Sequence, residues 1–242
     1  MLAGEASGDE HAASLAVALR QRVPNVRLVG TGGPMMKTAG VDLIAGLDDL
    51  AVMGIAEVLQ RLPFFWQLEH KIHKAIAEPP VSLVILIDYP GFNLRIARAA
   101  KKAGKRVLYY IAPKVWASRS RRVGLLSECV DRVAVILPFE EELFKNWGVQ
   151  ATFVGHPLLD RPDDVSDRST FCRTWGLDPG RPLLAILPGS RRQEVVRHLG
   201  TFIRASSLVA ETHPDILPVF SGMPGLDPSV YDGSSPMVVG DT

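Results

Sequence analysis

Short unbroken runs of hydrophobic residues recur along the chain, and segments with helical spacing lie between them. The clearest run is Leu83–Ile87, which contains no polar residue and closely follows two consecutive prolines. A run of this kind is typical of a strand in the middle of a parallel sheet, where both faces are buried. Because strands and helices alternate, the sequence predicts an α/β fold with doubly wound sheets.

The same alternation predicts the elements on both sides of this run. The expected strands lie at residues 26–29, 107–111, 132–136, 152–154, 183–187, 216–219 and 237–239. The expected helices include 94–103, 140–147, 169–175 and 192–211. Residues 155–167 are rich in proline and aspartate, as linkers between domains often are. We therefore expect two domains, at residues 1–157 and 158–242.

Asp88 directly follows the central hydrophobic run, at the end of the strand where open α/β sheets bind their ligands. A carboxylate in this position can act as a catalytic base. An aspartate there can equally cap the turn before the next helix, which we expect to begin near Leu94. This stretch alone favours the capping role.

A turn in the expected second domain has the composition of a phosphate-binding site. Gly189 lets the backbone approach a ligand, Ser190 can cap the following helix, and Arg191 can hydrogen-bond to phosphate oxygens. The order strand, Gly-Ser-Arg, helix suits a diphosphate. It suits a capped helix with a solvated arginine equally well.

Four further residues near expected strand ends are candidates for the same cleft. Trp116 can stack on a sugar or an acyl chain, and Arg119 can meet a phosphate. His156 lies where the two domains would meet, and Glu140 lies in the first turn of a helix. Structural roles remain open for all four: a core tryptophan, a solvated arginine, a histidine fixed beside proline, and an acid favoured by the helix dipole.

Residues 50–68 form the most apolar segment outside the strands, with helical spacing from residue 55 and a proline at position 63. Lysines and an arginine flank its aromatic residues, so the segment could contact a membrane surface. The alternative is a helix packed on the core. The candidate contact residues are Val58, Leu59, Leu62, Phe64, Phe65 and Trp66.

Composition adds limits to this picture. The chain has 242 residues, 47% of them hydrophobic and 22% charged, with a formal net charge of +1. A charge this close to zero gives no reason to expect a nucleic-acid partner. Cys129 and Cys172 lie far apart without metal-ligand spacing, so we expect no metal and a reduced, cytoplasmic protein. We expect no cofactor, since the amino-terminal glycine-rich turns lack the G-x-G-x-x-G fingerprint of a dinucleotide site. No apolar run is as long as a membrane-spanning helix, which needs about 18 residues.

Both ends of the sequence are unusual. Only three residues precede the glycine-rich turn at residues 4–9, too few for a normal first strand, and the last residues resemble a strand and a turn with nothing after them. We therefore expect a fragment of a longer chain, truncated at both ends.

Seven motifs, taken in order, resemble the lipid-A-disaccharide synthase family. They are G-E-A-S-G-D, L-A-V-M-G-I-x-E-V-L, I-D-x-P-x-F-N-L-R, V-W-A-x-R, L-P-F-E, V-G-H-P-L and L-P-G-S-R. The resemblance extends from Gly4 to Glu194 and is weaker to Thr242. It implies a GT-B-like fold with two Rossmann-like domains, the second incomplete, and an inverting, metal-independent glycosyltransferase.

The resemblance also implies a reaction and its site. Family members join UDP-2,3-diacylglucosamine to 2,3-diacylglucosamine 1-phosphate, release UDP and form the β-1′,6-linked disaccharide of lipid A. Asp88 matches the proposed general base, and Arg191 with Gly189 and Ser190 matches the donor diphosphate site. The amino-terminal cleft loop corresponds to Gly4, Glu5, Ser7, Gly8 and Asp9, and Asn93 in the Asp88 motif is a further acceptor-side candidate.

Further expectations follow from the family. The resemblance implies that the apolar segment contacts the membrane and the acyl chains. It also implies a peripheral protein on the cytoplasmic side of the inner membrane. The full-length chain is expected to be a possible homodimer. Gly91, Lys114 and Ser118 depart from the family pattern. Part of the family's donor site lies beyond Thr242, so we expect the 242 residues of this chain to be inactive on their own. The alternatives are a UDP-sugar epimerase on a GT-B-like fold and a non-catalytic remnant.

Overall fold

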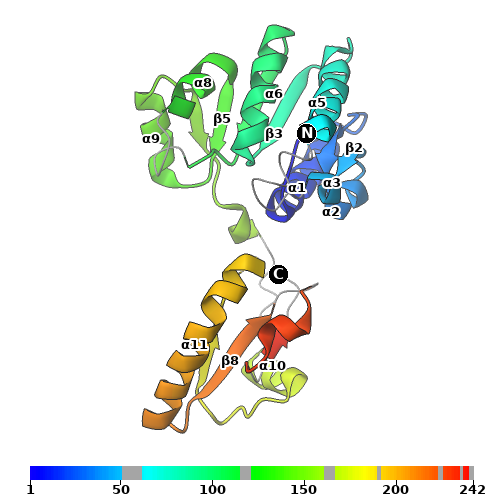
Figure 1. The fold of residues 1–242 in the computed structure, drawn as a ribbon. Coiled ribbons are helices and arrows are strands. Elements are labelled where there is room, and N and C mark those ends of the chain that lie inside the picture. Colours follow the sequence, from blue (N-terminus) through cyan, green and yellow to red (C-terminus); the bar gives the residue numbers. More distant parts are fainter. Residues whose placement is uncertain are drawn as a thin grey trace. The chain divides into compact units, whose positions relative to one another are not determined.

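The computed structural model describes residues 1–50, 62–114, 121–160, 167–189, 192–222, 226–234 and 237–239. The chain forms two compact units, Met1–Arg161 and Pro162–Thr242, and in each unit helices pack on a parallel sheet (Figure 1). The expected α/β fold class is confirmed. The division lies between residues 161 and 162, whereas the sequence places it between 157 and 158.

One parallel sheet organises the amino-terminal unit. Its strands are β1 (Val29–Gly32), β2 (Asp42–Gly46), β3 (Leu83–Ile87), β4 (Arg106–Tyr110), β5 (Arg132–Val135) and β6 (Ala151–Phe153). Hydrogen-bonded neighbours follow the orders β1-β2 and β3-β4-β5-β6. Leu2 forms parallel bridges to Thr31 of β1 and to Leu86 of β3, so the first residues join the two groups.

This arrangement creates a switch point in the sheet. From Leu2 the chain proceeds outward through β1 and β2 and then returns to form β3 on the other side of Leu2. Backbone hydrogen bonds of 2.9 Å from Leu2 N to Ile85 O and from Ile87 N to Leu2 O fix this register. Ligands of open α/β sheets bind at the carboxyl ends of strands at such a point.

The central strand is buried on both faces, as its unbroken hydrophobic run predicts. Val84 and Leu86 belong to one core cluster, while Ile85 and Ile87 belong to the other. Helices of the amino-terminal unit cover these two faces: α1 (Ala6–Arg22) and α2 (Pro34–Thr38) on one, and α5 (Leu62–Ala77), α6 (Pro90–Lys102), α8 (Arg121–Cys129) and α9 (Pro138–Asn146) on the other. A short helix, α3 (Leu47–Leu50), follows β2.

Two sequence expectations near proline and glycine were wrong. The helix expected near Leu94 begins four residues earlier, at Pro90. Pro63 lies in the first turn of α5, and the expected helical segment before it, from residue 55, lies outside the described residues. The strand expected at 26–29 lies at Val29–Gly32. Gly30 in this strand leaves room for Met1, since a Cβ atom on Gly30 would lie 1.6 Å from Met1 O.

The carboxyl-terminal unit has a smaller parallel sheet of order β7-β8-β9. Its elements are α10 (Arg168–Trp175), β7 (Leu183–Ile186), α11 (Arg192–Thr212), β8 (Leu217–Gly222), the 3-10 turn η2 (Pro228–Tyr231) and β9 (Met237–Val239). Val195 and Leu199 of α11 pack on Ile186 and Phe220 in the core. The 3-10 turn η1 (Pro157–Asp160) ends the described part of the first unit.

Candidate functional site

Two turns predicted to line one cleft lie against each other at the switch point. The first follows Leu2 and contains Gly4 and Glu5, and the second follows β3 and contains Asp88 and Tyr89. A Cβ atom on Gly4 would lie 2.4 Å from Cδ1 of Tyr89, so a side chain at position 4 would displace the ring. Burial and the negative charge of Glu5 raise the pKa of Tyr89, while Arg95 opposes this shift.

Asp88 occupies an unusual backbone conformation. Its φ is 43° and that of Tyr89 is 46°, so two successive non-glycine residues are left-handed. Aspartate tolerates this region, but a bulky residue such as tyrosine rarely adopts it. The N-cap of α6 is Tyr89, and Asp88 lies one residue before it, half-buried at the carboxyl end of β3.

Buried polar groups surround the Asp88 peptide. The carbonyl oxygen of Asp88 accepts hydrogen bonds from the Tyr109 hydroxyl at 2.6 Å and from Asn93 Nδ2 at 2.8 Å. The same Nδ2 lies 3.1 Å from the carbonyl oxygen of Ile87 and 3.3 Å from that of Leu2. Asn93, expected as an acceptor-side residue, is only 1% exposed, so its described contacts are with the backbone of the switch point.

The turn expected at residues 4–9 is only partly a turn, because Ser7, Gly8 and Asp9 lie at the start of α1. The five residues predicted as a cleft loop fall into two groups. Glu5 and Ser7 are exposed beside the switch point, whereas Gly8 is buried and packs near Ala3 and Ile87. Asp9 is 2% exposed. Its carboxylate accepts hydrogen bonds from the backbone N–H groups that begin α2, at Gly33 (2.7 Å), Met35 (3.0 Å) and Met36 (3.0 Å). These contacts give Asp9 a structural role.

The other predicted residues have local contacts of their own or lie outside the described residues. Glu140 is buried at the start of α9, where its Oε2 accepts a hydrogen bond from Leu137 N at 3.1 Å. The Nδ1 atom of His156 accepts one from Leu158 N at 3.3 Å. Gly189 has a φ of 147°, and a Cβ atom there would lie 2.5 Å from Cβ of Glu194 in α11. The predicted residues outside the described ranges are Val58, Leu59, Trp116, Arg119, Ser190 and Arg191, together with the side chain of Leu62.

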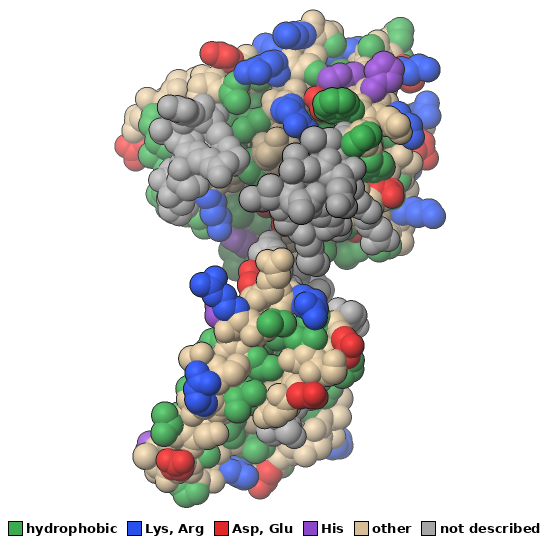
Figure 2. All heavy atoms as spheres, in the orientation of Figure 1, with side chains coloured by type: hydrophobic (Ala, Val, Ile, Leu, Met, Phe, Trp, Pro, Cys, Tyr) green, Lys and Arg blue, Asp and Glu red, His purple; other side chains and the backbone are tan. Residues whose placement is uncertain are grey.

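Helix α5 has one apolar face on the core and aromatic residues at its amino-terminal end. Leu68, Ile72 and Ile76 are buried, Phe64 and Phe65 pack against the same core, and Trp66 is 68% exposed. The exposed side chains on the same helix include His70, Lys71 and Lys74. Figure 2 shows histidine and basic side chains beside hydrophobic ones over this helix, at the upper right.

No helix within the described ranges has the length and hydrophobicity of a membrane-spanning segment. The described residues also contain no group of three or more His, Cys, Asp or Glu side chains that could hold a metal ion.

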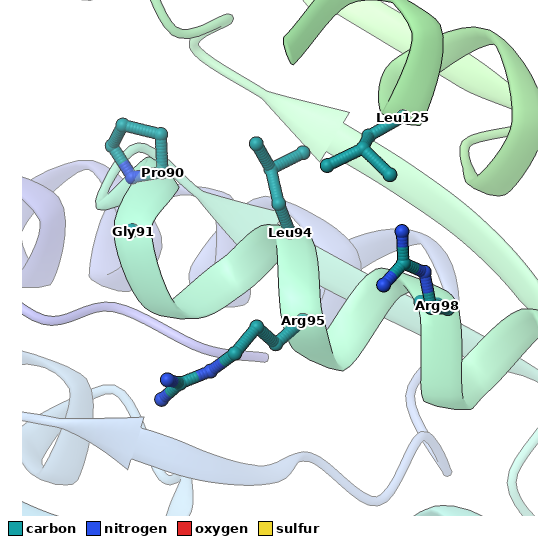
Figure 3. Close-up of a pocket in the computed structure, with 6 residues that line it drawn as sticks. All are labelled: Pro90, Gly91, Leu94, Arg95, Arg98 and Leu125. Atoms are coloured by element: carbon teal, nitrogen blue, oxygen red, sulfur yellow. The ribbon is translucent and has the colours of Figure 1, made fainter. Parts of the chain in front are cut away.

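A small pocket lies along α6, starting two residues after Asp88. Its volume is about 140 Å³, and it is lined by Pro90, Gly91, Leu94, Arg95, Arg98 and Leu125. Figure 3 shows Arg95 extending toward the Gly91 end of α6, while Arg98 rises toward Leu94 and Leu125. Arg95 also lies 3.5 Å from Glu69 of α5. Two guanidinium groups beside apolar side chains suit an anionic group on an amphiphilic molecule.

Sequence reasoning missed Tyr109, which is fully buried in β4 and bonds to Asp88. A tyrosine inside an apolar strand is a signal that could have found it, because a buried hydroxyl usually has a hydrogen-bond partner. The pocket arginines were also missed as a pair, although the helix expected at 94–103 already places Arg95 and Arg98 three residues apart, on the same side of that helix.

Comparison with known proteins identifies similar chains. The family model described as lipid-A-disaccharide synthetase matches residues 1–225. A curated lipid-A-disaccharide synthase from Syntrophus aciditrophicus is 48% identical over 211 residues, which cover 87% of this chain and 55% of that protein. One from Geobacter metallireducens is 40% identical over 230 residues, covering 94% and 60%. The chain thus spans little more than half the length of these relatives.

Among solved structures, a putative UDP-N-acetylglucosamine 2-epimerase from Listeria monocytogenes has a similar fold. Its TM-score is 0.63 at 14% identity, and the match covers 96% of this chain and 63% of that chain. Identity this low shows the fold alone, and it agrees with the expected GT-B-like architecture.

Proposed function

Because the chain belongs to the lipid-A-disaccharide synthetase family, we propose that the protein carrying this sequence transfers 2,3-diacylglucosamine from its UDP donor to 2,3-diacylglucosamine 1-phosphate. The products are UDP and the β-1′,6-linked disaccharide. One observation supports this proposal above the others: Asp88 follows the buried central strand at the switch point of the sheet, beside the turn of Gly4 and Glu5.

In the proposed reaction, the Asp88 carboxylate accepts the proton of the acceptor 6-hydroxyl. The 6-oxygen forms a bond to the anomeric carbon of the donor, and the bond from that carbon to UDP breaks on the opposite face, which inverts the configuration. The leaving diphosphate needs cationic or amide donors. We assign this task to Arg191 and to the backbone N–H groups of the turn that begins α11.

We assign the pocket of Arg95 and Arg98 to the acceptor. Its lining begins at Pro90, immediately beyond Asp88 and Tyr89, and continues for about two turns of α6. In the acceptor, C1 carries the phosphate and C5 carries the 6-hydroxymethyl group, and both carbons flank the ring oxygen, so the phosphate lies within one sugar ring of a 6-hydroxyl at Asp88. The guanidinium groups suit that phosphate, and Leu94 and Leu125 suit a neighbouring apolar group.

Arg98→Gln tests this assignment. We expect KM for the phosphorylated acceptor to rise about tenfold, because a charge-assisted hydrogen bond is lost, while KM for the UDP donor stays unchanged. The control is Arg132→Gln, which alters an exposed arginine at the start of β5. Equal effects of the two substitutions, or equal effects on both substrates, would contradict the assignment.

We further propose that α5 docks the protein on the cytoplasmic face of the inner membrane, since both substrates carry acyl chains that stay in a bilayer. Trp66 would enter the interface, while Lys71 and Lys74 would face anionic head groups. A homodimer of the full-length protein stays a prediction.

Trp66→Ala should weaken binding to vesicles that contain phosphatidylglycerol by about tenfold, because it removes a large apolar surface from the interface. Cosedimentation measures this binding. Phe139→Ala is the matched control, since Phe139 is an aromatic residue of α9 that is 51% exposed. Unchanged binding by the Trp66 variant would show that α5 does not enter the bilayer.

The reaction itself is tested with the product of the longest reading frame that encodes this sequence. The two acylated sugars together should yield disaccharide and UDP, and omission of the acceptor should prevent UDP release. Conversion of a UDP-sugar without the acylated acceptor would support the epimerase alternative. Absence of any turnover would support a non-catalytic protein.

A further inference from the structure

The left-handed turn at Asp88 and Tyr89 needs support from the surrounding structure. Residues held in such sparsely populated backbone regions cost free energy, and they persist only where neighbouring groups determine their conformation. Here two of them occur in succession, with φ values of 43° and 46°. The groups that fix this turn also fix the direction in which the Asp88 side chain leaves the backbone.

Two buried side chains, far apart in the sequence, meet at the peptide that joins Asp88 to Tyr89. The Tyr109 hydroxyl donates to the Asp88 carbonyl oxygen at 2.6 Å, and Asn93 Nδ2 donates to the same oxygen at 2.8 Å. Both lone pairs of that oxygen are therefore engaged. On the other side of the residue, Asp88 N donates to the backbone oxygen of Tyr110 at 3.2 Å.

Asn93 also connects this turn to the sheet. Its side-chain amide nitrogen lies within 3.3 Å of two carbonyl oxygens, those of Ile87 and Leu2. Ile87 is the last residue of β3, and Leu2 forms the bridge beside that strand. One amide group thus spans the three backbone oxygens at the switch point. Tyr109 supports the turn from the neighbouring strand β4.

We infer that Tyr109 and Asn93 are positioning residues for the general base: they hold the Asp88 peptide in its left-handed conformation and so aim the carboxylate at the acceptor hydroxyl. This inference rests on the proposed function. Neither side chain contacts substrate in this role. The contribution arises because a carboxylate that is already oriented needs no reorganisation when the proton is transferred.

Tyr109→Phe removes one hydroxyl and keeps the buried ring, so it is the mildest test. We expect kcat to fall about tenfold, because small displacements of reacting groups are costly, while both KM values remain within about twofold of the unmodified protein. Tyr110→Phe is the matched control, since it removes the next hydroxyl along β4 and leaves the backbone oxygen that binds Asp88 N. It should leave kcat unchanged. Asn93→Ala, if it folds, should lower kcat at least as much as Tyr109→Phe.

A double-mutant cycle separates positioning from general stabilisation. If Tyr109 acts through Asp88, Tyr109→Phe should have no further effect in a protein that already carries Asp88→Asn. The same fold reduction in both backgrounds, or an unchanged kcat in Tyr109→Phe alone, would overturn the inference.

A second measurement does not depend on catalysis. Hydrogen exchange of the Asp88 amide should accelerate in Tyr109→Phe and not in Tyr110→Phe, since its bond to Tyr110 O depends on the turn. If the unmodified protein forms no disaccharide but this exchange changes as expected, the proposed function fails while the support of the turn by Tyr109 stands. Unchanged exchange would overturn the inference whatever the activity.

Discussion

Asp88→Asn should reduce disaccharide formation by about 10²–10⁴-fold while leaving the protein folded. Asparagine has nearly the same shape as aspartate but cannot accept the proton of the acceptor hydroxyl. The hydrogen bonds that fix the turn use the carbonyl oxygen and the N–H of residue 88, and the substitution retains both. The variant should therefore lose chemistry without losing structure.

Single-turnover rates with saturating substrates measure this loss, and thermal denaturation checks the fold. Asp42→Asn serves as the control, because Asp42 is an exposed aspartate whose ion pair with Arg27 lies at the surface. Near-normal turnover by Asp88→Asn would remove Asp88 from the role of base. A large drop in melting temperature would instead indicate that its carboxylate is needed for folding.

The largest loss of stability should follow from Asp9→Ala. Three backbone N–H groups at the start of α2 lose the carboxylate that accepts their hydrogen bonds, in a place that is 2% exposed. Because a buried donor without a partner costs about 1–3 kcal/mol, we expect the free energy of unfolding to fall by about 3 kcal/mol or more. The free energy of unfolding of Asp9→Asn should lie between those of the unmodified protein and Asp9→Ala, since the side-chain carbonyl oxygen of asparagine can still accept a hydrogen bond.

Urea denaturation measures this series, with the midpoint reporting stability if the slope is unchanged. Asp42→Ala is again the control and should cost little, since exposed ion pairs contribute about 0–1 kcal/mol. Equal midpoints for Asp9→Ala and Asp42→Ala would show that the contacts of Asp9 are dispensable. Any loss of activity in the Asp9 variants should follow their stability rather than their chemistry.

Parts of this structure that depend on local pattern could be predicted from the sequence. The strand β3 was predicted because burial on both faces imposes an unbroken apolar run. The start of α6 was not, because Pro90 and Gly91 were interpreted as a turn. Proline is equally favourable in the first turn of a helix, where its missing N–H has no partner to lose. The same ambiguity applies to Pro63 in α5.

The candidate site shows a sharper division between local and tertiary information. The position of Asp88 at a strand end follows from the sequence. Its support by Tyr109 joins the turn after β3 to β4, and the tyrosine in the apolar run does not show which group its hydroxyl will bond. Asp9 illustrates the same point, since it lies in a recognisable motif but bonds to the start of α2, beyond β1. Side-chain direction at these positions depends on the assembled sheet, so the motif alone could not assign their roles.

The bridge from Leu2 to β3 imposes an order on folding. Residue 2 cannot complete its hydrogen bonds until residues 85 and 87 have left the ribosome and joined it. Contacts between such distant residues form late, because the intervening chain must first lose conformational freedom. During synthesis the bridge at Leu2 therefore forms only after β3 has been made, and the turn that carries Asp88 directly follows that strand.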